Sequence, residues 1–351
     1  MSAGFDALDG EAVLAAIRER MLAALPSGDP HPELDRFAAL QRDYPRRPGK
    51  ALRGRVVVLS AAAHGATDWD AALTVAAAVE LFQAWVLVHD DIEDGSEERR
   101  GAPTLHRLAG VPVAINVGDA MHAHMWRLLH GLLGQGPEEG SRAGVAPRVL
   151  DEFGTMVSRT AAGQHLDLAW VETGRFDVGE DEYLRMVTLK TAWYTVASPL
   201  RLGAILAGRE PSAHLTRAGL DLGAAFQVRD DVLNLQSGAA EAGYGKEELG
   251  DLYEAKRTLM LAHLLGAAPP AVADEVVRLL SGPRAERTRE GALRVLELMR
   301  AHGSLAHAQA VARRLAASGL AALDEALAGA PSPRASAALR RELAAVAERS
   351  R

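Results

Sequence analysis

The sequence predicts an all-α protein, a large single-domain helical bundle with a cavity between its central helices. Alanine, leucine, arginine and glutamate are abundant, and apolar residues recur at three- and four-residue spacing, which is the period of an amphipathic helix. No stretch alternates apolar and polar residues convincingly enough to indicate a half-buried strand. Segments of about ten to twenty-five residues are separated by short loops rich in glycine and proline, as expected for a bundle of roughly ten or more helices.

The first helix is expected close to the N-terminus. Val13, Ile17 and Met21 share one of its faces, because residues four apart lie on the same side of a helix. Breaks that contain proline and glycine follow at residues 27–32 and 44–49, and each predicts a loop. The chain is therefore expected to turn twice before its central helices begin.

The central helices are expected to be buried. Residues 55–63, RVVVLSAAA, are the best candidate for a strand, but the run continues into alanines and favours a buried helix. Residues 71–88 form the most apolar long stretch and are long enough to cross a membrane. Because Glu80 and Gln83 lie within this stretch and a cluster of aspartates ends it, we expect a core helix and no membrane span.

The helical pattern continues to the C-terminus. Loops are expected at three segments rich in glycine and proline, residues 133–147, 237–245 and 266–271. Leu293, Leu296 and Met299 form a further apolar stripe. Nothing in the chain resembles a linker between domains, so residues 1–329 are expected to form one domain. The tail, residues 330–351, is predicted to be a loosely packed helix.

Charge and composition narrow the functional classes. The 351 residues carry a net charge of −7, from 39 basic and 46 acidic residues, whereas a nucleic-acid-binding protein more often has a basic surplus. The chain has no cysteine, which excludes disulfides and thiolate metal sites and suits a reducing compartment. Its first residues lack a basic region followed by an apolar stretch, so no signal peptide is expected. We therefore predict a cytoplasmic protein that binds a small ligand.

An acidic cluster ends the most apolar stretch, in the segment LVHDDIEDGSEERRG. Asp90 and Asp94 are four residues apart and project from one face of a helix, with Asp91 about 100° around. Carboxylates that converge in this way repel one another unless a cation lies between them. Since neither thiolates nor closely spaced histidines accompany them, the implied ion is hard and oxygen-preferring, such as Mg²⁺. The alternative is a helix end whose charges lie in water.

The acidic pattern recurs in the segment FQVRDDVLNLQ. Asp230 and Asp231 again follow an apolar helical run, and Asn234 lies one turn beyond Asp230. Two such helices, facing each other across a bundle, would form a pocket for several metal ions. Nine basic residues in the surrounding segments are candidates to bind a diphosphate there: Lys50, Arg53, Arg55, Arg99, Arg100, Lys190, Lys246, Lys256 and Arg257. Arginine would bind phosphate oxygens bidentately, and lysine would act as a point charge.

These segments together resemble the trans-isoprenyl diphosphate synthase (polyprenyl synthetase) family. HDDIEDGSEERRG is similar to the family's first aspartate-rich motif, and FQVRDDVLNL is similar to its second. PGKALRG, NVGDA, GQHLDL, KTAWY and the GK…DLYEAKRTL region resemble further motifs, in the order of the family. The resemblance spans residues 45–259, and the chain looks most like the short-chain geranylgeranyl and farnesyl diphosphate synthases.

The resemblance implies a head-to-tail condensation of isopentenyl diphosphate with an allylic diphosphate, dimethylallyl, geranyl or farnesyl. It implies about three Mg²⁺ ions per active site, with Mn²⁺ able to replace them. The implied metal ligands are Asp90, Asp91, Asp94, Asp230, Asp231 and Asn234. The implied allylic diphosphate site comprises Arg99, Lys190, Lys246 and Lys256, and the isopentenyl diphosphate site comprises Lys50, Arg53, Gln83 and Arg100. Lys190, Thr191 and Gln227 are the implied catalytic residues, and Gln164 and Asp167 support the metal-binding face.

The sequence departs from the family pattern at three positions. Gln83 stands where the family commonly has a histidine, so a hydrogen-bond donor is kept but a charge is lost. Gly54 stands in place of a proline after Arg53. Asn234 replaces the last aspartate of the second motif and offers an oxygen without a charge, so Asp230 would hold more of the third ion.

Product length would depend on side chains about one turn before Asp90. Trp85 and Val86 lie there, and they would form the floor of the groove into which the allylic chain grows. An aromatic residue followed by a small one, with no insertion in the motif, resembles the synthases of geranylgeranyl diphosphate (C20). We therefore expect a C20 product, with farnesyl diphosphate (C15) as the alternative. If Trp85 instead packs between helices, another side chain sets the length.

Two other activities remain alternatives. A class I terpene cyclase shares a first aspartate-rich cluster, but its second metal site usually reads NDxxSxxxE, unlike RDDVLNLQ, and it would have no use for Lys50 and Arg53. A non-catalytic subunit of a partner synthase would typically lack one of the two motifs, and both are present. The family usually forms homodimers through its long central helices, so a homodimer is expected here as well.

Overall fold

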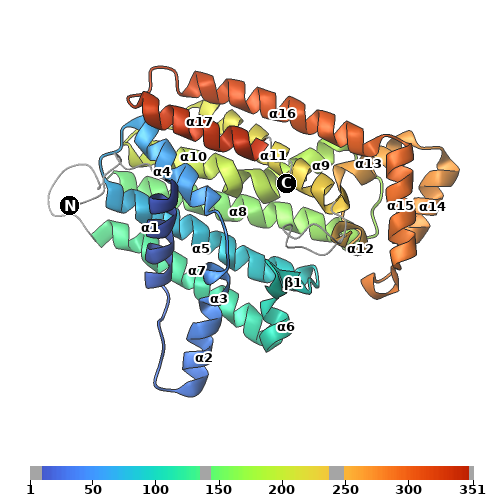
Figure 1. The fold of residues 1–351 in the computed structure, drawn as a ribbon, viewed down its shortest axis with the longest axis horizontal. Coiled ribbons are helices and arrows are strands. Elements are labelled where there is room, and N and C mark those ends of the chain that lie inside the picture. The colour runs from blue at the N-terminus through green and yellow to red at the C-terminus, as the bar shows by residue number, and fades with distance from the viewer. Residues whose placement is uncertain (1–9, 135–143, 237–248, 348–351) are drawn as a thin grey trace.

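The computed structural model describes residues 10–134, 144–236 and 249–347, and nearly every element within these ranges is a helix (Figure 1). The longer helices are α1 (Gly10–Ala23), α4 (Leu52–His64), α5 (Trp69–Glu93), α7 (Val111–Gly134), α8 (Val145–Glu172), α11 (Ala213–Gln236), α15 (Arg289–Ala301), α16 (Ser304–Ala326) and α17 (Pro333–Ala347). The shorter ones are α2 (Pro32–Gln41), α3 (Asp43–Arg46), α6 (Leu105–Ala109), α9 (Glu180–Val187), α10 (Ser198–Leu206), α12 (Gly250–Tyr253), α13 (Leu259–Ala267) and α14 (Pro270–Leu280). A π-helix, η1 (Thr188–Ala197), a 3-10 helix, η2 (Arg284–Glu286), and a small hairpin of β1 (Glu98–Arg99) and β2 (Ala102–Pro103) complete the fold. The prediction of an all-α bundle is confirmed.

Helix α5 is the central core helix. The side chain of Asp68 caps its N-terminus by accepting a hydrogen bond from the backbone N–H of Ala71 at 3.0 Å. By length and composition α5 could cross a membrane, but 72% of its most apolar window is buried inside the protein. That burial agrees with the core helix that the sequence predicts. The cytoplasmic location stays a prediction.

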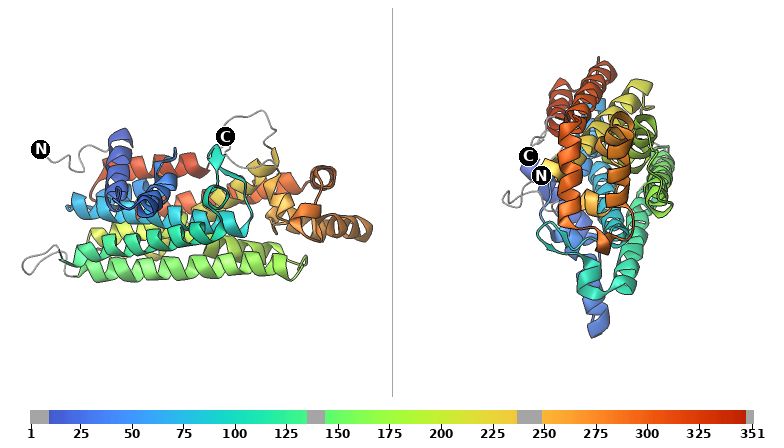
Figure 2. Two further views of the ribbon diagram at one scale, coloured as in Figure 1. Left: turned by 90° about the horizontal axis from the view of Figure 1, so that it is seen from below. Right: turned by 90° about the vertical axis from the view of Figure 1, so that its right-hand side faces the viewer.

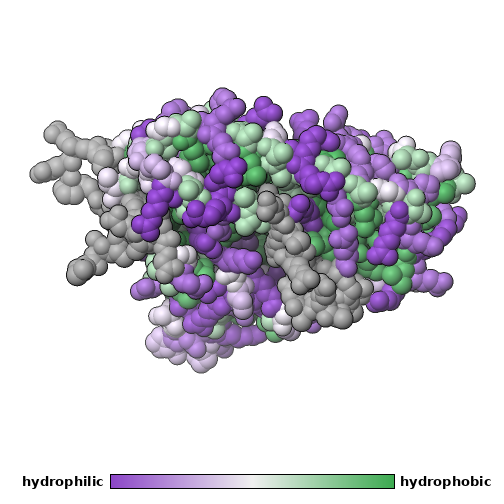
Figure 3. Space-filling view, turned by 45° about the horizontal axis from the view of Figure 1, so that its top comes forward, coloured by the Kyte–Doolittle hydropathy of each residue, from purple (hydrophilic) through white to green (hydrophobic). Residues whose placement is uncertain are grey.

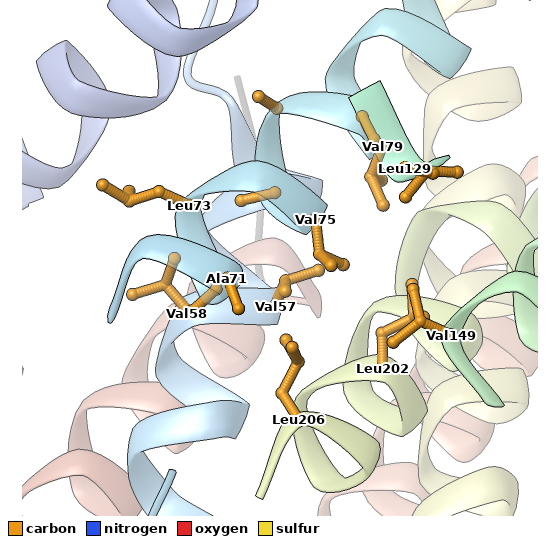
Figure 4. Packing of buried hydrophobic residues seen from close by; sticks show 14 of the residues in the cluster. Val57, Val58, Ala71, Leu73, Val75, Val79, Leu129, Val149, Leu202 and Leu206 are labelled. Carbon is orange, nitrogen blue, oxygen red and sulfur yellow. The ribbon is translucent and has the colours of Figure 1, made fainter. Parts of the chain in front are cut away.

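The core forms where α5 meets its neighbours. Figure 4 shows Val57 of α4 and Val75 of α5 in one cluster with Leu129 of α7, Val149 of α8 and Leu202 of α10. All five side chains are fully buried, so their burial from water stabilises the contact between these helices. α7 packs along α5, and α8 lies next to α7 along one face of the molecule (Figure 2).

Close helix packing around η1 depends on glycine. A Cβ at Gly223 of α11 would lie 2.5 Å from the Cα of Ala192 in η1, and a Cβ at Gly163 of α8 would collide with the backbone of Lys190. Only a residue without a side chain allows backbones to approach so closely. Gly163 opens the GQHLDL motif, and its position explains why a glycine stands there.

Two expectations about helix faces need correction. Leu293 is 43% exposed, whereas Leu296 and Met299 of the same stripe are buried. Two successive steps of three residues rotate a helix face by about 120°, so Leu293 turns away from the core. The tail after residue 329 is a helix, α17, but it is closely packed, since Ala335, Leu339 and Leu343 are fully buried in a cluster with residues of α4 and α16.

Polar residues cover much of the described surface. On the face seen in Figure 3, hydrophilic side chains predominate and smaller groups of hydrophobic ones lie between them. The large apolar side chains that remain exposed concentrate at α6 and α7: Leu108, Val111, Val113, Ile115 and Leu133. Exposed apolar groups of this kind are typical of a protein–protein contact.

Candidate active site

A cavity of about 1440 Å³ opens between α4, α5, α8, η1 and α11. The residues predicted from sequence that line it are Lys50, Arg53, Gln83, Trp85, Val86, Asp90, Arg99, Arg100, Gln164, Lys190, Thr191, Gln227, Asp230 and Lys256. Five predicted residues are not among those that line it: Asp91, Asp94, Asp167, Asp231 and Asn234. Lys246 lies outside the described residues. The two aspartate-rich helix ends therefore share one cavity, with Asp90 on one side and Asp230 on the other.

The first acidic cluster stands at the end of α5 because the helix stops there. Gly95 adopts a φ of 64°, which glycine tolerates readily, and the N–H of Ser96 bonds back to the carbonyl of Asp91 at 3.0 Å. Asp90 faces the cavity, where its Oδ1 lies 3.7 Å from the Nζ of Lys190 and 3.4 Å from the Nε2 of Gln164. The cluster thus meets α8 and η1 through Asp90.

Asp91 turns away from the cavity and is fully buried. Its carboxylate accepts a hydrogen bond from Arg99 Nε at 2.9 Å and one from the hydroxyl of Tyr44. A buried carboxylate needs such compensation, because burial without partners would favour its neutral form. The pair holds Arg99, at the hairpin, against the end of α5, with Arg99 Nη2 also 3.6 Å from Asp90 Oδ2.

Asp94 is paired with a lysine from the far end of the chain. Lys256 Nζ lies 2.7 Å from Asp94 Oδ2 and 2.7 Å from an oxygen of Glu254. Burial raises the pKa of Asp94, and the neighbouring Asp90 adds to the rise while Lys256 opposes it. Burial alone would lower the pKa of Lys256, but Asp94 and Glu254 outweigh that effect and hold it well above its usual value. Lys256 is therefore a permanent cation at the edge of the acidic site.

Lys190 is held in the same way on the π-helix η1. Its Nζ lies 2.5 Å from Asp167 Oδ2 of α8. Burial lowers its pKa, but Asp167 and Asp90 outweigh burial and raise it. Long π-helical segments are rare and often mark functional positions, because the wider turn redirects side chains. Here the segment turns Lys190, Thr191 and Tyr194 toward one cavity.

The second acidic cluster also divides between cavity and interior. Asp230 lines the cavity, whereas Asp231 accepts hydrogen bonds from Tyr183 at 2.6 Å and from Gln227 Nε2 at 2.7 Å. Gln227 Oε1 in turn accepts a hydrogen bond from the hydroxyl of Thr191 at 3.0 Å. Burial raises the pKa of Tyr183, and the charge of Asp231 adds to the effect, so its hydroxyl stays protonated.

Asn234 has a different neighbour. It is buried, and its Oδ1 accepts a hydrogen bond from the backbone N–H of Asp251 at 3.2 Å. This contact ties α11 to the start of α12, on the segment that leads to Lys256. The metal-ligand role predicted for Asn234 stays a prediction.

A second group of cations, Lys50, Arg53 and Arg100, also lines the cavity. Arg53 donates to Thr195 Oγ1 at 3.0 Å and stacks over the ring of Tyr194 at 4.5 Å. Within the described ranges, neither Lys50 nor Arg100 has a hydrogen bond or ion pair with another side chain. Burial lowers the pKa of Arg100, and Arg53 and Arg99 add to this while Glu80 opposes it. An anion bound here would relieve that repulsion.

Backbone strain also collects beside these cations. Ala51, between Lys50 and Arg53, has a φ of 43°, and Arg100 has a φ of 55°. Side chains other than glycine rarely adopt this left-handed conformation, and strain of this kind clusters at functional sites. The strain here lies on two of the segments that carry the cations.

The apolar end of the cavity has an aromatic floor. Trp85 and Val86 line it, as the sequence predicts, and the ring of Phe82 meets Trp85 edge-on at 5.4 Å. His122 and Trp126 of α7 lie behind Trp85 and were not predicted. Their four-residue spacing places them on one helix face, but the sequence does not reveal which helix that face meets.

Sequence reasoning also missed three polar residues at the site. Glu93 lines the cavity and accepts a hydrogen bond from Gln164 Nε2 at 2.5 Å. Tyr44 and Tyr183 are the buried donors to Asp91 and Asp231. Glu93 could have been found, since it lies inside the first acidic cluster. The tyrosines carry no such signal, because each is far from its aspartate along the chain.

The donor set suits Mg²⁺ that is shared with a phosphate group. Asp90, Glu93 and Asp230 offer carboxylate oxygens to the cavity, and these are the ligands that Mg²⁺ prefers. Among the residues that the structure describes, no three histidine, aspartate or glutamate side chains converge closely enough to hold a metal ion by themselves. Mg²⁺ usually keeps several waters and binds through one or two carboxylates together with substrate phosphates. The residues therefore fit an ion that is completed by a diphosphate.

Comparison with known proteins agrees with this geometry. The family model of polyprenyl synthetases matches residues 35–297. A short chain isoprenyl diphosphate synthase of Methanothermobacter thermautotrophicus is 34% identical over 282 residues, which cover 79% of this chain and 81% of that protein. A geranylfarnesyl diphosphate synthase of Aeropyrum pernix is 33% identical over 284 residues, 80% of this chain and 84% of that protein.

A solved structure has the same fold over almost the whole chain. It is a geranylgeranyl pyrophosphate synthase from Corynebacterium glutamicum complexed with isoprenyl diphosphate and magnesium, with a TM-score of 0.83 and 28% identity. The match covers 97% of this chain and 99% of that one. With a shared cavity, two acidic helix ends and a family model that matches most of its length, this chain belongs to the polyprenyl synthetase family.

Proposed function

We propose that this prenyltransferase condenses isopentenyl diphosphate with an allylic diphosphate and releases mainly geranylgeranyl diphosphate (C20). One observation carries the proposal. Asp90 and Asp230 line a single cavity whose wall also contains a group of cations and a group of apolar and aromatic side chains. A molecule with a charged head and a hydrocarbon tail matches that division.

The allylic diphosphate would bind between the two acidic helix ends. Arg99, Lys190 and Lys256 are the cations nearest to Asp90 and Asp94, and they would bind phosphate oxygens. Mg²⁺ held by Asp90, Asp94 and Asp230 would neutralise the diphosphate and make it a better leaving group. Asp91 and Asn234 would support these residues from behind, and the role of Lys246 stays a prediction.

Isopentenyl diphosphate would bind at the second group of cations, Lys50, Arg53 and Arg100. Lys50 and Arg100 have no hydrogen bond or ion pair with another side chain among the described residues, and Arg53 presents a guanidinium fixed by Thr195. Cations of this kind can donate charge-assisted hydrogen bonds to a bound anion such as a diphosphate. Gln83 lines the same region and could donate a hydrogen bond to it without adding a charge.

The reaction needs a pocket that excludes water and has polar groups beside the reacting carbons. The C–O bond of the allylic diphosphate breaks, positive charge spreads over the allylic carbons, and the double bond of isopentenyl diphosphate forms the new C–C bond. The oxygens of Thr191 and Gln227 line the cavity beside Lys190, where they would stabilise that charge. Phe82, Trp85 and Tyr194 exclude water, which would otherwise quench it. A proton is then lost to the released diphosphate.

Product length would be set by the aromatic floor. Trp85 stands across the path of the growing chain, and His122 and Trp126 back it. The similar proteins carry names that differ in product, from geranylgeranyl to geranylfarnesyl, so relatedness alone leaves the length open. Trp85 favours a C20 product, and C15 is the alternative.

A homodimer would cover the exposed apolar side chains of α7. Val111, Val113 and Ile115 are 44%, 37% and 40% exposed at its N-terminal end, beside Leu108 of α6. A second copy packed against this face would bury them, and burial of apolar surface stabilises association. Light scattering after size-exclusion chromatography should report twice the mass of the chain.

The test is a product analysis of the purified protein. We expect Mg²⁺-dependent consumption of isopentenyl diphosphate with dimethylallyl, geranyl or farnesyl diphosphate, and C20 as the main product. Chelation of the metal should stop turnover, and Mg²⁺ or Mn²⁺ should restore it. Consumption of an allylic diphosphate alone, with release of a cyclic hydrocarbon, would instead indicate a terpene cyclase. No turnover without a partner protein would indicate a non-catalytic subunit.

A further inference from the structure

The two acidic pairs share an arrangement that the sequence does not reveal. In each pair the first aspartate, Asp90 or Asp230, lines the cavity. The second, Asp91 or Asp231, is buried and accepts a hydrogen bond from a buried tyrosine of another helix. At the first pair the remaining partner is the cation Arg99. At the second pair Gln227 donates a hydrogen bond from its neutral amide to the carboxylate of Asp231.

The hydrogen bonds around Asp231 have only one consistent polarity. An ionised carboxylate accepts hydrogen bonds and cannot donate them. The hydroxyl of Tyr183 must therefore donate to one of its oxygens, and the amide nitrogen of Gln227 must donate to the other. Since its nitrogen is committed to Asp231, Gln227 must turn its oxygen toward Thr191.

The same direction of hydrogen bonding continues to the cavity wall. Thr191 donates its hydroxyl hydrogen to Gln227 Oε1 at 3.0 Å, and both residues line the cavity. The lone pairs of the Thr191 hydroxyl and of the Gln227 amide oxygen are then the groups left to face the cavity. If Gln227 were reversed, its amide hydrogens would face Thr191, and a positive dipole end would lie beside the reacting carbons.

We propose that Asp231 is a positioning residue, held by Tyr183, that fixes the orientation of Gln227 so that the oxygens of Thr191 and Gln227 face the allylic cation. The proposal rests on the proposed function and replaces the metal-ligand role expected for Asp231. It assigns the metal-binding side of the second motif to Asp230, which lines the cavity. Asp231 acts through the amide and touches neither the metal ion nor the substrate.

The main test is Asp231→Asn, which keeps the size of the side chain. Its amide can donate to Gln227, so that Gln227 can reverse. We expect kcat for condensation to fall about 10- to 100-fold, as for other residues that orient a functional group, with the KM of both substrates close to wild type. Tyr183→Phe should lower kcat in the same direction by a smaller factor. Unchanged kcat in both variants would overturn the proposal.

A rescue variant tests the polarity itself. In Asp231→Asn combined with Gln227→Glu, the carboxylate at position 227 can accept hydrogen bonds from both Asn and Thr191, which restores the lone pairs toward the cavity. We expect the kcat of the double variant to be about tenfold higher than that of Asp231→Asn, which corresponds to a barrier lower by roughly 1.4 kcal/mol. If the double variant is no more active than the single one, polarity is not what Asp231 supplies.

A metal-binding measurement separates this proposal from the proposed function. Mn²⁺ binding in the presence of inorganic diphosphate can be followed by electron paramagnetic resonance without any turnover. Asp230→Asn should weaken it, whereas Asp231→Asn should bind Mn²⁺ as the wild type does. Equal weakening in both variants would make Asp231 a metal ligand and overturn the proposal. Wild-type protein that binds Mn²⁺ but condenses nothing would count against the proposed function instead.

Control variants keep folding defects apart from positioning effects. Tyr253→Phe removes a hydroxyl that has no hydrogen bond within the described part of the chain, and it should leave kcat unchanged. Circular dichroism at increasing temperature should show that each variant is folded under assay conditions. If Asp231→Asn does not fold, Tyr183→Phe carries the test, since it removes the hydroxyl that donates to Asp231 and leaves the aspartate in place.

Discussion

The indole ring of Trp85 stacks on the imidazole ring of His122, with the ring centroids 4.0 Å apart and the ring planes inclined by 13°. His122 Nε2 accepts a hydrogen bond from Trp126 Nε1 at 2.7 Å, and the ring of Trp126 meets Phe153 beyond it at 6.4 Å. The floor of the cavity is thus several aromatic layers deep, built from α5, α7 and α8. Removal of the first layer leaves the next one in place.

Trp85→Ala should therefore lengthen the product, but only by about one or two five-carbon units, the space that a lost large side chain opens. The double variant Trp85→Ala/His122→Ala should lengthen it further, because the second layer is also gone. Chromatography of the dephosphorylated products measures both effects. Trp69→Ala, at the opposite end of α5, is the matched control and should leave the C20 product unchanged. If the double variant gives the same distribution of product lengths as the wild type, the floor of the cavity lies elsewhere.

Arg100→Ala should selectively weaken the binding of isopentenyl diphosphate. Loss of a charge-assisted contact to a diphosphate costs about 1.5–3 kcal/mol, so the KM for isopentenyl diphosphate should rise about 10- to 100-fold. The KM for the allylic diphosphate should not change, since Arg99, Lys190 and Lys256 lie by Asp90 and Asp94. Steady-state kinetics with each substrate varied in turn gives both values. Arg107→Ala, in an exposed ion pair with Glu97, serves as control. If the KM values for both substrates rise, the two diphosphates do not bind at separate sites.

Ala51→Gly should stabilise the protein. Ala51 has a φ of 43° just before α4, where glycine is less strained and is also the better N-cap. We expect the free energy of unfolding to rise by about 1 kcal/mol, which corresponds to a Tm increase of roughly 2 °C. Ala15→Gly, at an exposed position inside α1, should have the opposite sign. Equal destabilisation in both variants would argue against strain at Ala51.

His263 should make the protein less stable in mild acid. Burial lowers its pKa from 6.5, and the neighbouring His307, which stacks on it at 4.2 Å, adds to the effect while Glu180 opposes it. As the pH falls below 6.5, the unfolded chain takes up a proton before the folded protein does, so stability is lost from there down to the folded pKa.

Removal of that histidine should reduce the acid sensitivity. We expect the Tm of His263→Gln to fall less between about pH 7.5 and about pH 5.5 than the Tm of the wild type. Differential scanning calorimetry at the two pH values measures the difference. The exposed His31→Gln is the control and should fall as much as the wild type. A parallel loss in wild type and His263→Gln would assign the acid sensitivity to other groups.

The parts of the fold that follow from local pattern could be predicted. Residues 71–88 are apolar enough to identify a core helix, and α5 is that helix. The run at 55–63 was correctly interpreted as helical because alanines follow its valines. The close packing of α17 could not be predicted, because its partner α4 lies at the other end of the chain. The ion pair of Arg55 and Glu342 joins residues 287 positions apart.

The candidate site was predictable in its composition but not in its orientation. The repeated acidic pattern was enough to expect Asp90 and Asp230 in one cavity. That Asp91 and Asp231 point inward depends on Tyr44 and Tyr183, which lie 47 and 48 residues away in sequence. Neither tyrosine belongs to an acidic or basic cluster, so only the tertiary structure reveals which carboxylate of each pair is buried.

The first and last described helices have a consequence for how the protein is made. Arg18 of α1 and Glu342 and Val346 of α17 all line the same cavity. The ribosome synthesises α1 early and α17 late, so the cavity is incomplete until residue 346 has left the exit tunnel. A nascent chain therefore cannot form the whole cavity before translation reaches α17.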